Sequence, residues 1–237
     1  MDELGKKPGR YYPLFLSIEG RTCLVVGGGA VGERKVRSLL RYGACIRLVA
    51  RELTPWLHEQ CSGRRVCLAG TRYEKAHIDG VSLVFAATSD LELNRTVAAD
   101  AHERGLWCNM ATDPELGSFI VPSVVERGSL SIAVSTAGLS PAVSKALRQR
   151  LENEFGAEWE FFIELLGELR KYFRSRQIQE KDCRRVFGDL AALPVPRWLR
   201  EGCREKALLK VSEICSPLVH REELQPIWDN LWNPFFS

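Results

Sequence analysis

Short apolar runs alternate with amphipathic stretches through the first half of the chain. Five runs are rich in branched residues and poor in charge, as buried strands are, and they cover residues 22–26, 45–50, 65–70, 81–88 and 106–111. Residues 32–42 and 91–104 have the apolar spacing of helices. Strands that alternate with helices imply crossover connections, so this pattern predicts the α/β fold class with a parallel sheet.

The pattern changes after the fifth run. Residues 119–138 hold two β-rich runs around the sequence ERGS, which predicts a hairpin, and Pro122 places its strand at an edge. Ser140 and Pro141 are residue types preferred at the N-cap and first turn of a helix. From there the chain has a helical pattern, with breaks near residues 192–196 and 215–220. We therefore expect an α/β domain, a short β-rich connector and a helical tail.

A glycine-rich turn follows the first predicted strand. Gly27, Gly29 and Gly32 match the pattern G-x-G-x-x-G between a buried strand and a helix, the context a dinucleotide site requires. Gly27 permits the tight turn, Gly29 allows close approach of a pyrophosphate, and Gly32 lets helix and strand pack closely. The helix N-terminus adds free N–H groups for the phosphates. The alternative is a glycine-rich turn without a ligand.

The choice between NAD and NADP stays open at this point. An acidic residue that binds the ribose is expected at the end of the second strand. The sequence there is VARE, so Glu52 comes slightly late and Arg51 precedes it. Arg51 is either a ligand of a 2′-phosphate or a solvated surface residue.

Composition restricts the function classes. Hydrophobic residues are 45% of the 237, and the net charge of +3 is too small to indicate a nucleic-acid partner. No apolar run approaches the roughly 20 residues of a membrane span, and the N-terminus lacks the apolar stretch of a signal peptide. We therefore expect a cytoplasmic protein without a membrane partner. The eight cysteines form no CxxC pair and the four histidines do not cluster with them, which favours buried, reduced thiols and no metal site.

Three blocks in order carry a resemblance to a known family. They begin with YYPLFLSIEGRTCLVVGGGAVGERK at residue 11, LVFAATSDLELNRTVAAD at residue 83 and GSLSIAVSTAGLSPAVSKALRQRLE at residue 128. Together they resemble the precorrin-2 dehydrogenases, which form the dehydrogenase and sirohydrochlorin ferrochelatase module of siroheme synthases. The tail beyond about residue 175 carries no recognisable motif.

The resemblance implies an architecture and a reaction. It implies a Rossmann-type NAD domain at 1–115, a dimerisation segment at 116–150, a helical domain at 151–237 and a homodimer. The implied reaction is oxidation of precorrin-2 to sirohydrochlorin with NAD as the hydride acceptor, followed in some members by ferrous iron insertion. Family members contact the dinucleotide at positions matching Ala30, Val31, Arg51 and Glu52. The alternative is an NAD-binding regulatory or redox-sensing module, which would need only the α/β half.

Candidate substrate residues follow from the charge of a polycarboxylate macrocycle. Lys145 and Arg148 lie three apart on a predicted helix and are candidates to bind carboxylates, or they form a solvated helix face. Thr136 matches a family serine that lines the substrate cleft and Ser140 lies beside it, although hydroxyl groups in tight turns often bond only to backbone. Thr88, after the fourth strand, either faces the nicotinamide side of the crevice or caps the strand end.

One position departs from the family pattern. The family has an aspartate between an asparagine and a proline, and aligning Asn109 and Pro114 puts Thr112 at that position. Thr112 cannot be a carboxylate base. Asp113 either replaces the lost carboxylate or caps the turn before Pro114. Metal insertion requires removal of two pyrrole protons, so we expect dehydrogenase activity more than chelatase activity, with a separate chelatase as a partner.

Overall fold

The computed structural model describes residues 11–216 and 218–236. The expectation about a signal peptide concerns the N-terminus, of which residues 1–10 lie outside the described residues. Five parallel strands form one sheet in the order β3-β2-β1-β4-β5. The strands are β1 Thr22–Val26, β2 Cys45–Val49, β3 Val66–Gly70, β4 Leu83–Ala86 and β5 Trp107–Met110. The predicted α/β class and parallel sheet are confirmed.

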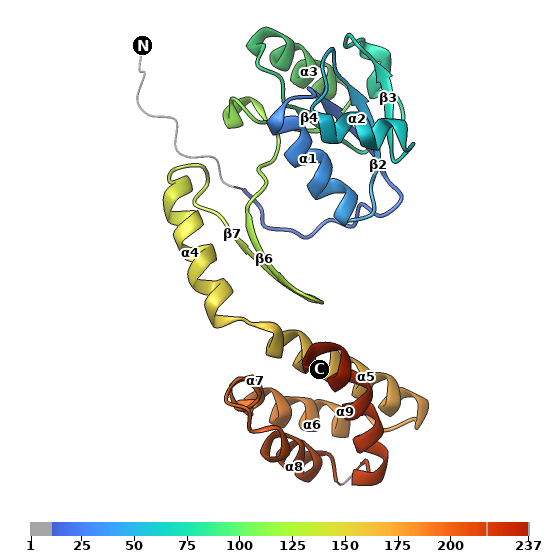
Figure 1. The fold of residues 1–237 in the computed structure, drawn as a ribbon, viewed down its shortest axis with the longest axis vertical. Coiled ribbons are helices and arrows are strands. Elements are labelled where there is room, and N and C mark those ends of the chain that lie inside the picture. The colour runs from blue at the N-terminus through green and yellow to red at the C-terminus, as the bar shows by residue number, and fades with distance from the viewer. Residues whose placement is uncertain (1–10, 217, 237) are drawn as a thin grey trace. The chain divides into compact units, whose positions relative to one another are not determined.

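Helices cover both faces of this sheet (Figure 1). In β1, Cys23 and Val25 join the apolar cluster under helices α1 (Ala30–Arg41) and α2 (Pro55–Ser62). Leu24 and Val26 join the cluster under α3 (Leu91–Glu103). Alternate side chains of a strand point to opposite faces, so a strand covered on both sides needs the unbroken apolar run that predicted it.

Local sequence explains where the helices begin and end. Helix α1 ends before Gly43, whose φ of +74° is the left-handed conformation that suits glycine after a helix. Helix α2 is absent from the sequence-based expectation because its eight residues show little apolar periodicity. Its start is nevertheless marked by Thr54, whose hydroxyl accepts a hydrogen bond from the Leu57 amide, and by Pro55 in the first turn.

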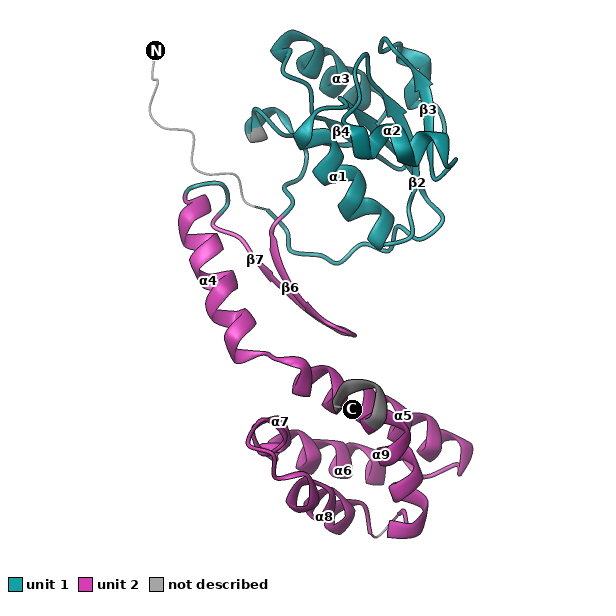
Figure 2. Ribbon diagram, viewed as in Figure 1, with its two compact units in different colours: residues 1–121, 137–139 teal, residues 122–136, 140–237 magenta. Residues whose placement is uncertain are grey.

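The chain divides into two compact units (Figure 2). Unit 1 comprises Met1–Val121 with Ala137–Leu139, and unit 2 comprises Pro122–Thr136 with Ser140–Ser237. The predicted hairpin is present in unit 2 as β6 (Ser123–Arg127) and β7 (Leu130–Val134). Its turn packs on α5 (Ala157–Ser175), because a Cβ on Gly128 would lie 2.5 Å from Cγ of Glu160.

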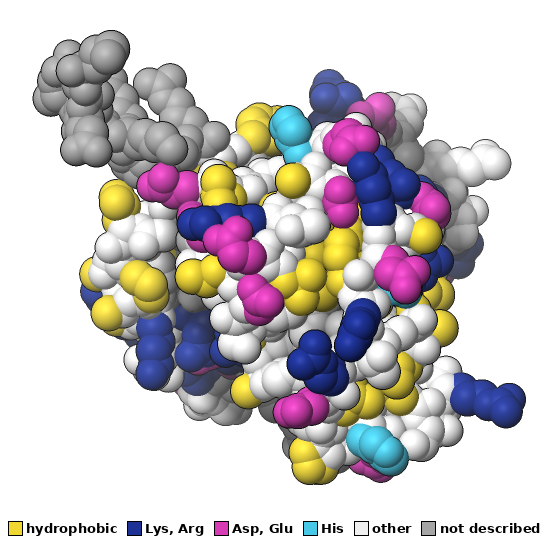
Figure 3. Space-filling model, turned by 90° about the horizontal axis from the view of Figure 1, so that it is seen from above, with side chains coloured by type: hydrophobic (Ala, Val, Ile, Leu, Met, Phe, Trp, Pro, Cys, Tyr) yellow, Lys and Arg dark blue, Asp and Glu magenta, His cyan; other side chains and the backbone are white. Residues whose placement is uncertain are grey.

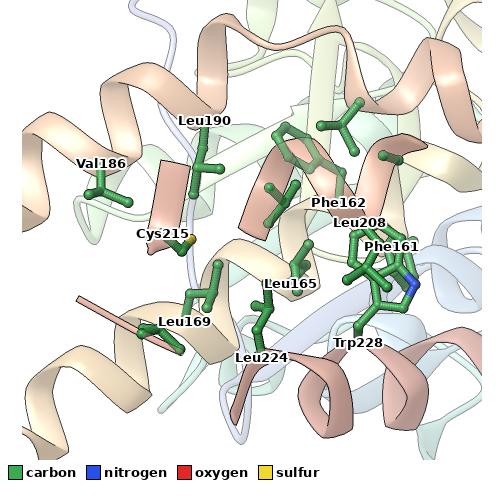
Figure 4. Close-up of a cluster of buried hydrophobic side chains, with 14 of the residues drawn as sticks. Phe161, Phe162, Leu165, Leu169, Val186, Leu190, Leu208, Cys215, Leu224 and Trp228 are labelled. Atoms are coloured by element: carbon green, nitrogen blue, oxygen red, sulfur yellow. The ribbon is translucent and has the colours of Figure 1, made fainter. Parts of the chain in front are cut away.

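The helical part of unit 2 has an aromatic core of its own. Helices α5 to α9 bury a cluster that includes Phe161, Leu165 and Trp228 (Figure 4). Trp228 is fully buried, with its ring centroid 5.0 Å from that of Phe161, so this tryptophan serves core packing. The helices of unit 2 are α4 Pro141–Glu154, α5 as given, α6 Glu180–Ala192, α7 Val195–Arg200, α8 Arg204–Cys215 and α9 Arg221–Phe236.

All eight cysteines are free. Burial raises the pKa of the Cys215 thiol to about 12 and that of Cys23 to about 11. Cys45 was expected to be buried because it begins an apolar run, but it is exposed at the first position of β2. Among the described residues, no three metal-ligating side chains come together, and no helix in that part is long and apolar enough to cross a membrane.

Candidate dinucleotide and substrate site

The glycine turn links the end of β1 to the start of α1, and two of its three motif glycines leave no space for a side chain. A Cβ on Gly27, whose φ is +121°, would lie 2.4 Å from the carbonyl oxygen of Ala87. A Cβ on Gly32 would lie 1.9 Å from the carbonyl oxygen of Gly27. Strand, turn and helix therefore pack backbone against backbone, as expected from the motif.

Gly29 differs from both, because a Cβ placed on it would meet no described atom within 4 Å. It is the N-cap of α1, and as a glycine it has no side chain to cap this helix end. The amides of Ala30 and Val31 lie in the first turn, where a helix has no acceptor for its N–H groups. An open space beside free amides and the positive end of the helix dipole fits a pyrophosphate.

The loop after β2 lies beside this turn. A Cβ on Gly28 would lie 2.1 Å from the carbonyl oxygen of Glu52, so this glycine, which falls between the motif positions, is also required by packing. Only the run of three consecutive glycines pointed to it in the sequence. The side chains of Arg51 and Glu52 are exposed next to the turn, where a ribose would be bound.

A charged bridge formed by Glu33 and Arg37 connects α1 to the start of α2. Glu33 accepts a hydrogen bond from Nε of Arg37 at 2.7 Å, and the Arg37 guanidinium lies 3.7 Å from the ring centroid of Trp56. A hydrogen bond from Thr54 and the Arg37 interaction hold the pKa of Glu33 below its usual range. This bridge fixes the helix end that would hold the phosphates.

The carboxyl ends of β4 and β5 are joined by side chains. Asn94, fully buried at the start of α3, accepts a hydrogen bond from the Thr88 amide at 3.1 Å. Its Nδ2 donates to Oγ1 of Thr112 at 3.2 Å. Thr88 and Thr112, predicted from separate motifs, thus belong to one network at the edge where a Rossmann sheet opens to its ligands.

Asp113 and Asn109 make local contacts. Oδ1 of Asp113 accepts a hydrogen bond from the Glu115 amide at 3.2 Å, in the turn that leads into the short 3-10 helix Pro114–Leu116, which favours the capping interpretation. Asn109 is buried, and its Nδ2 donates to the carbonyl of Phe119 at 3.0 Å. Its Oδ1 has no partner among the described atoms.

Lys35, which the sequence did not indicate as a site residue, lies on the same face of the sheet as Asn109. Nζ of Lys35 is 5.7 Å from the ring centroid of Phe85, and Phe85 pairs in register with Asn109 on the next strand. Burial, and secondarily the charge of Arg34, lower the pKa of Lys35 to about 8. Nothing in the basic run of α1 distinguishes Lys35 in the sequence, because its environment depends on β4.

The candidate substrate residues of unit 2 lie around the start of α4. Oγ of Ser140 accepts a hydrogen bond from the Val143 amide, which confirms the predicted N-cap. The Thr136 hydroxyl bonds to the backbone of Ser140 and lies 3.0 Å from Oγ of Ser144. Arg148 pairs with Glu152 one turn later, whereas Lys145 is exposed. Figure 3 shows basic side chains interspersed with acidic and apolar ones on the face that it presents.

Comparisons with known proteins agree with this geometry. The family model described as putative NAD(P)-binding matches residues 14–123, and the model described as sirohaem biosynthesis protein central matches residues 127–154. A solved structure described as SirC, precorrin-2 dehydrogenase, has a TM-score of 0.73 and 24% identity, and covers 92% of this chain and 100% of that one. That structure therefore has the same fold.

Two of the similar curated proteins are siroheme synthases. Siroheme synthase of Methylobacillus flagellatus is 38% identical over 175 residues, 74% of this chain and 37% of that protein. Siroheme synthase 2 of Aeromonas hydrophila is 42% identical over 160 residues, 68% of this chain and 34% of that protein. The chain thus spans about a third of the length of these relatives. The resemblance found in the sequence is confirmed: the chain belongs to the siroheme synthase family, which it matches in the NAD(P)-binding and central segments.

Proposed function

We propose that this chain oxidises precorrin-2 to sirohydrochlorin with NAD as the hydride acceptor. The observation that carries the proposal is the open space at Gly29, beside the free amides of α1, within a chain that matches both family segments in order. A regulatory NAD-binding module would need the first segment alone. The second segment, residues 127–154, therefore favours the enzyme.

The amides of Ala30 and Val31 would hold the pyrophosphate, with Arg51 and Glu52 near the adenosine ribose and Thr88 toward the nicotinamide. NAD, when bound, supplies the acceptor for one hydride, and the substrate also loses one proton. We propose NAD rather than NADP because the family that the chain resembles uses NAD. Measuring the affinities for NAD and for NADP tests this choice. Tighter binding of NADP would contradict it and would indicate that Arg51 binds the 2′-phosphate.

The tetrapyrrole is a polyanion, so its ligands must include cations and hydrogen-bond donors. Lys145 is exposed, so its ammonium is accessible to a substrate carboxylate, and Arg148 would have to share its charge with Glu152. Asn109 of unit 1 and, separately, Thr136 and Ser140 of unit 2 are further candidate substrate ligands in this proposal. Lys145→Met should therefore raise the KM for precorrin-2 more than Arg148→Met does.

We further propose a homodimer formed through residues 116–150. The ribbon β6–β7 is a sheet of two strands, and two-stranded ribbons are marginal by themselves. Val143 and Leu147, one turn apart on α4, expose 48% and 38% of their surfaces. Light scattering should give the mass of a dimer, and Leu147→Glu should shift it toward the monomer. A cytoplasmic location is part of the same proposal and is tested by cell fractionation.

Metal insertion is the weaker activity in this proposal. Thr112 stands where the family has an aspartate, so position 112 offers no carboxylate to take up pyrrole protons, and Oδ1 of Asp113 accepts a hydrogen bond in its own turn. We propose that a separate chelatase completes the pathway. Adding ferrous ion after dehydrogenation tests this, since rapid insertion by the wild-type chain would contradict it. A gain of insertion in Thr112→Asp would support it.

The decisive experiment mixes the protein with precorrin-2 and NAD without oxygen and follows NADH absorbance. Gly29→Ala should fold normally, because its added methyl group meets no described atom, but should weaken NAD binding about tenfold, a cost of roughly 1.4 kcal/mol. Gly32→Ala is the matched control, because the same methyl group there collides with backbone and should lower the melting temperature. Absence of NADH with fresh substrate would defeat the proposal.

A further inference from the structure

The amide of Asn94 connects the ends of two strands. Within the described structure it makes four hydrogen bonds: with the Thr88 amide at 3.1 Å, the Thr88 hydroxyl at 2.8 Å, the Thr88 carbonyl at 3.0 Å and the Thr112 hydroxyl at 3.2 Å. Asn94 is fully buried, so these bonds are shielded from water. A buried amide with its hydrogen-bonding capacity filled has a fixed orientation.

That orientation can be assigned from chemistry. The Thr88 backbone N–H can only donate, so the Asn94 atom facing it is the oxygen Oδ1. Nδ2 therefore faces the Thr88 carbonyl and the Thr112 hydroxyl. Because Nδ2 can only donate, Oγ1 of Thr112 must accept, and the hydroxyl hydrogen of Thr112 is left to donate elsewhere.

The position of Thr112 indicates which molecule it faces. In the sheet order β3-β2-β1-β4-β5, the phosphate turn follows β1, and the nicotinamide half of a dinucleotide extends toward β4. Thr112 follows β5, one strand further on, and is exposed. A ligand at this end is therefore on the substrate side, and its acceptor groups are carboxylates if it is a tetrapyrrole acid.

We propose that Asn94 is a positioning residue that holds Thr112 as a hydrogen-bond donor to a substrate carboxylate. This proposal rests on the proposed function. It gives position 112 a different task from that of a carboxylate: Thr112 binds an anion and accepts no proton during the reaction. The same Nδ2 would donate to a carboxylate placed there, so Asn94 supports either chemistry.

Two variants of Thr112 test the donor role. Thr112→Val removes the hydroxyl at nearly constant volume and should raise the KM for precorrin-2 about three- to tenfold, the loss expected for one hydrogen bond. Thr112→Ser keeps the hydroxyl and should stay within about twofold of wild type. The affinity for NAD should change in neither variant. The melting temperature should fall only in the valine variant, because the buried Nδ2 of Asn94 then loses an acceptor. An unchanged KM in the valine variant, or equal losses in both, would overturn the proposal.

A second measurement tests Asn94 without catalysis. The carboxyl group introduced by Thr112→Asp should titrate at a lower pH with Asn94 present than in the Asn94→Leu background, because a donated hydrogen bond stabilises the ionised form. Carbon-13 NMR would measure a separation of about half a unit or more. Identical titrations would show that Asn94 does not donate to position 112. If the wild type forms no NADH, the proposed function fails while this titration still decides the role of Asn94.

Discussion

The glycine turn of unit 1 and the helical core of unit 2 respond to opposite changes. At the turn, backbone approaches backbone so closely that an added methyl group on Gly27 or Gly32 would collide with a carbonyl. In the bundle, large side chains such as Phe161 and Trp228 fill the interior. The first region is sensitive to added atoms and the second to removed atoms, because one is built around a place for a ligand and the other around its own packing.

The largest expected effect comes from removing atoms from the bundle. Trp228→Ala deletes a fully buried indole in contact with Phe161 and should lower the free energy of unfolding by about 3–5 kcal/mol. Chemical denaturation would measure this loss. Trp228→Phe is the matched control and should cost less. If unit 1 is self-sufficient, the affinity for NAD in native buffer should persist, and a parallel loss of affinity would break the comparison.

A smaller effect is expected from adding one atom beside the turn. Gly28→Ala places a Cβ 2.1 Å from the carbonyl oxygen of Glu52 and 2.7 Å from Cβ of Ala50. The loop after β2 must shift, so we expect a loss of about 1–3 kcal/mol, as for other overpacked sites. Calorimetry would compare the melting temperatures of Gly28→Ala and Gly29→Ala, and that of Gly28→Ala should be the lower. Equal melting temperatures would contradict the steric difference between neighbouring glycines.

These contrasts explain what the sequence could predict. Gly27 and Gly32 were assigned their roles because their requirement is local and recurs in a known spacing. The strands were visible because both faces of the sheet are covered, which forces unbroken apolar runs. Helix α2 was missed because its eight residues show little apolar periodicity, although Thr54 and Pro55 marked its start.

The polar side of the site was less predictable. Thr112 and Thr88 were singled out separately, yet their connection through Asn94 depends on the neighbouring carboxyl ends of β4 and β5. The sequence left two interpretations of Asp113, a catalytic carboxylate or a cap of the turn. The hydrogen bond that it accepts from the Glu115 amide favours the cap. Hydrogen bonds such as those of Asn94 join strand ends that are close in space but far apart in the sequence, so they leave no periodic pattern in the sequence.

The smallest effect is expected at Lys35, which lies over Phe85 without a carboxylate partner among the described residues. Burial lowers its pKa to about 8 in the folded chain, whereas an unfolded lysine titrates near pH 10.4. Above pH 8 the folded state releases its proton first, the unfolded state then binds more protons, and stability rises with pH. Lys35→Met lacks this rise and should be more stable at pH 7 by about 1 kcal/mol or less after screening.

The measurement is the difference in free energy of unfolding between wild type and Lys35→Met from pH 7 to pH 10. The variant's advantage should shrink as the pH passes 8, because the wild type no longer has to bury a charge. Lys206→Met is the matched control, since that ammonium lies 4.7 Å from the Trp198 ring centroid on the exposed surface of the bundle. A constant difference for Lys35 across this range would mean that its ammonium is solvated in the folded chain, like the exposed side chain of Lys206.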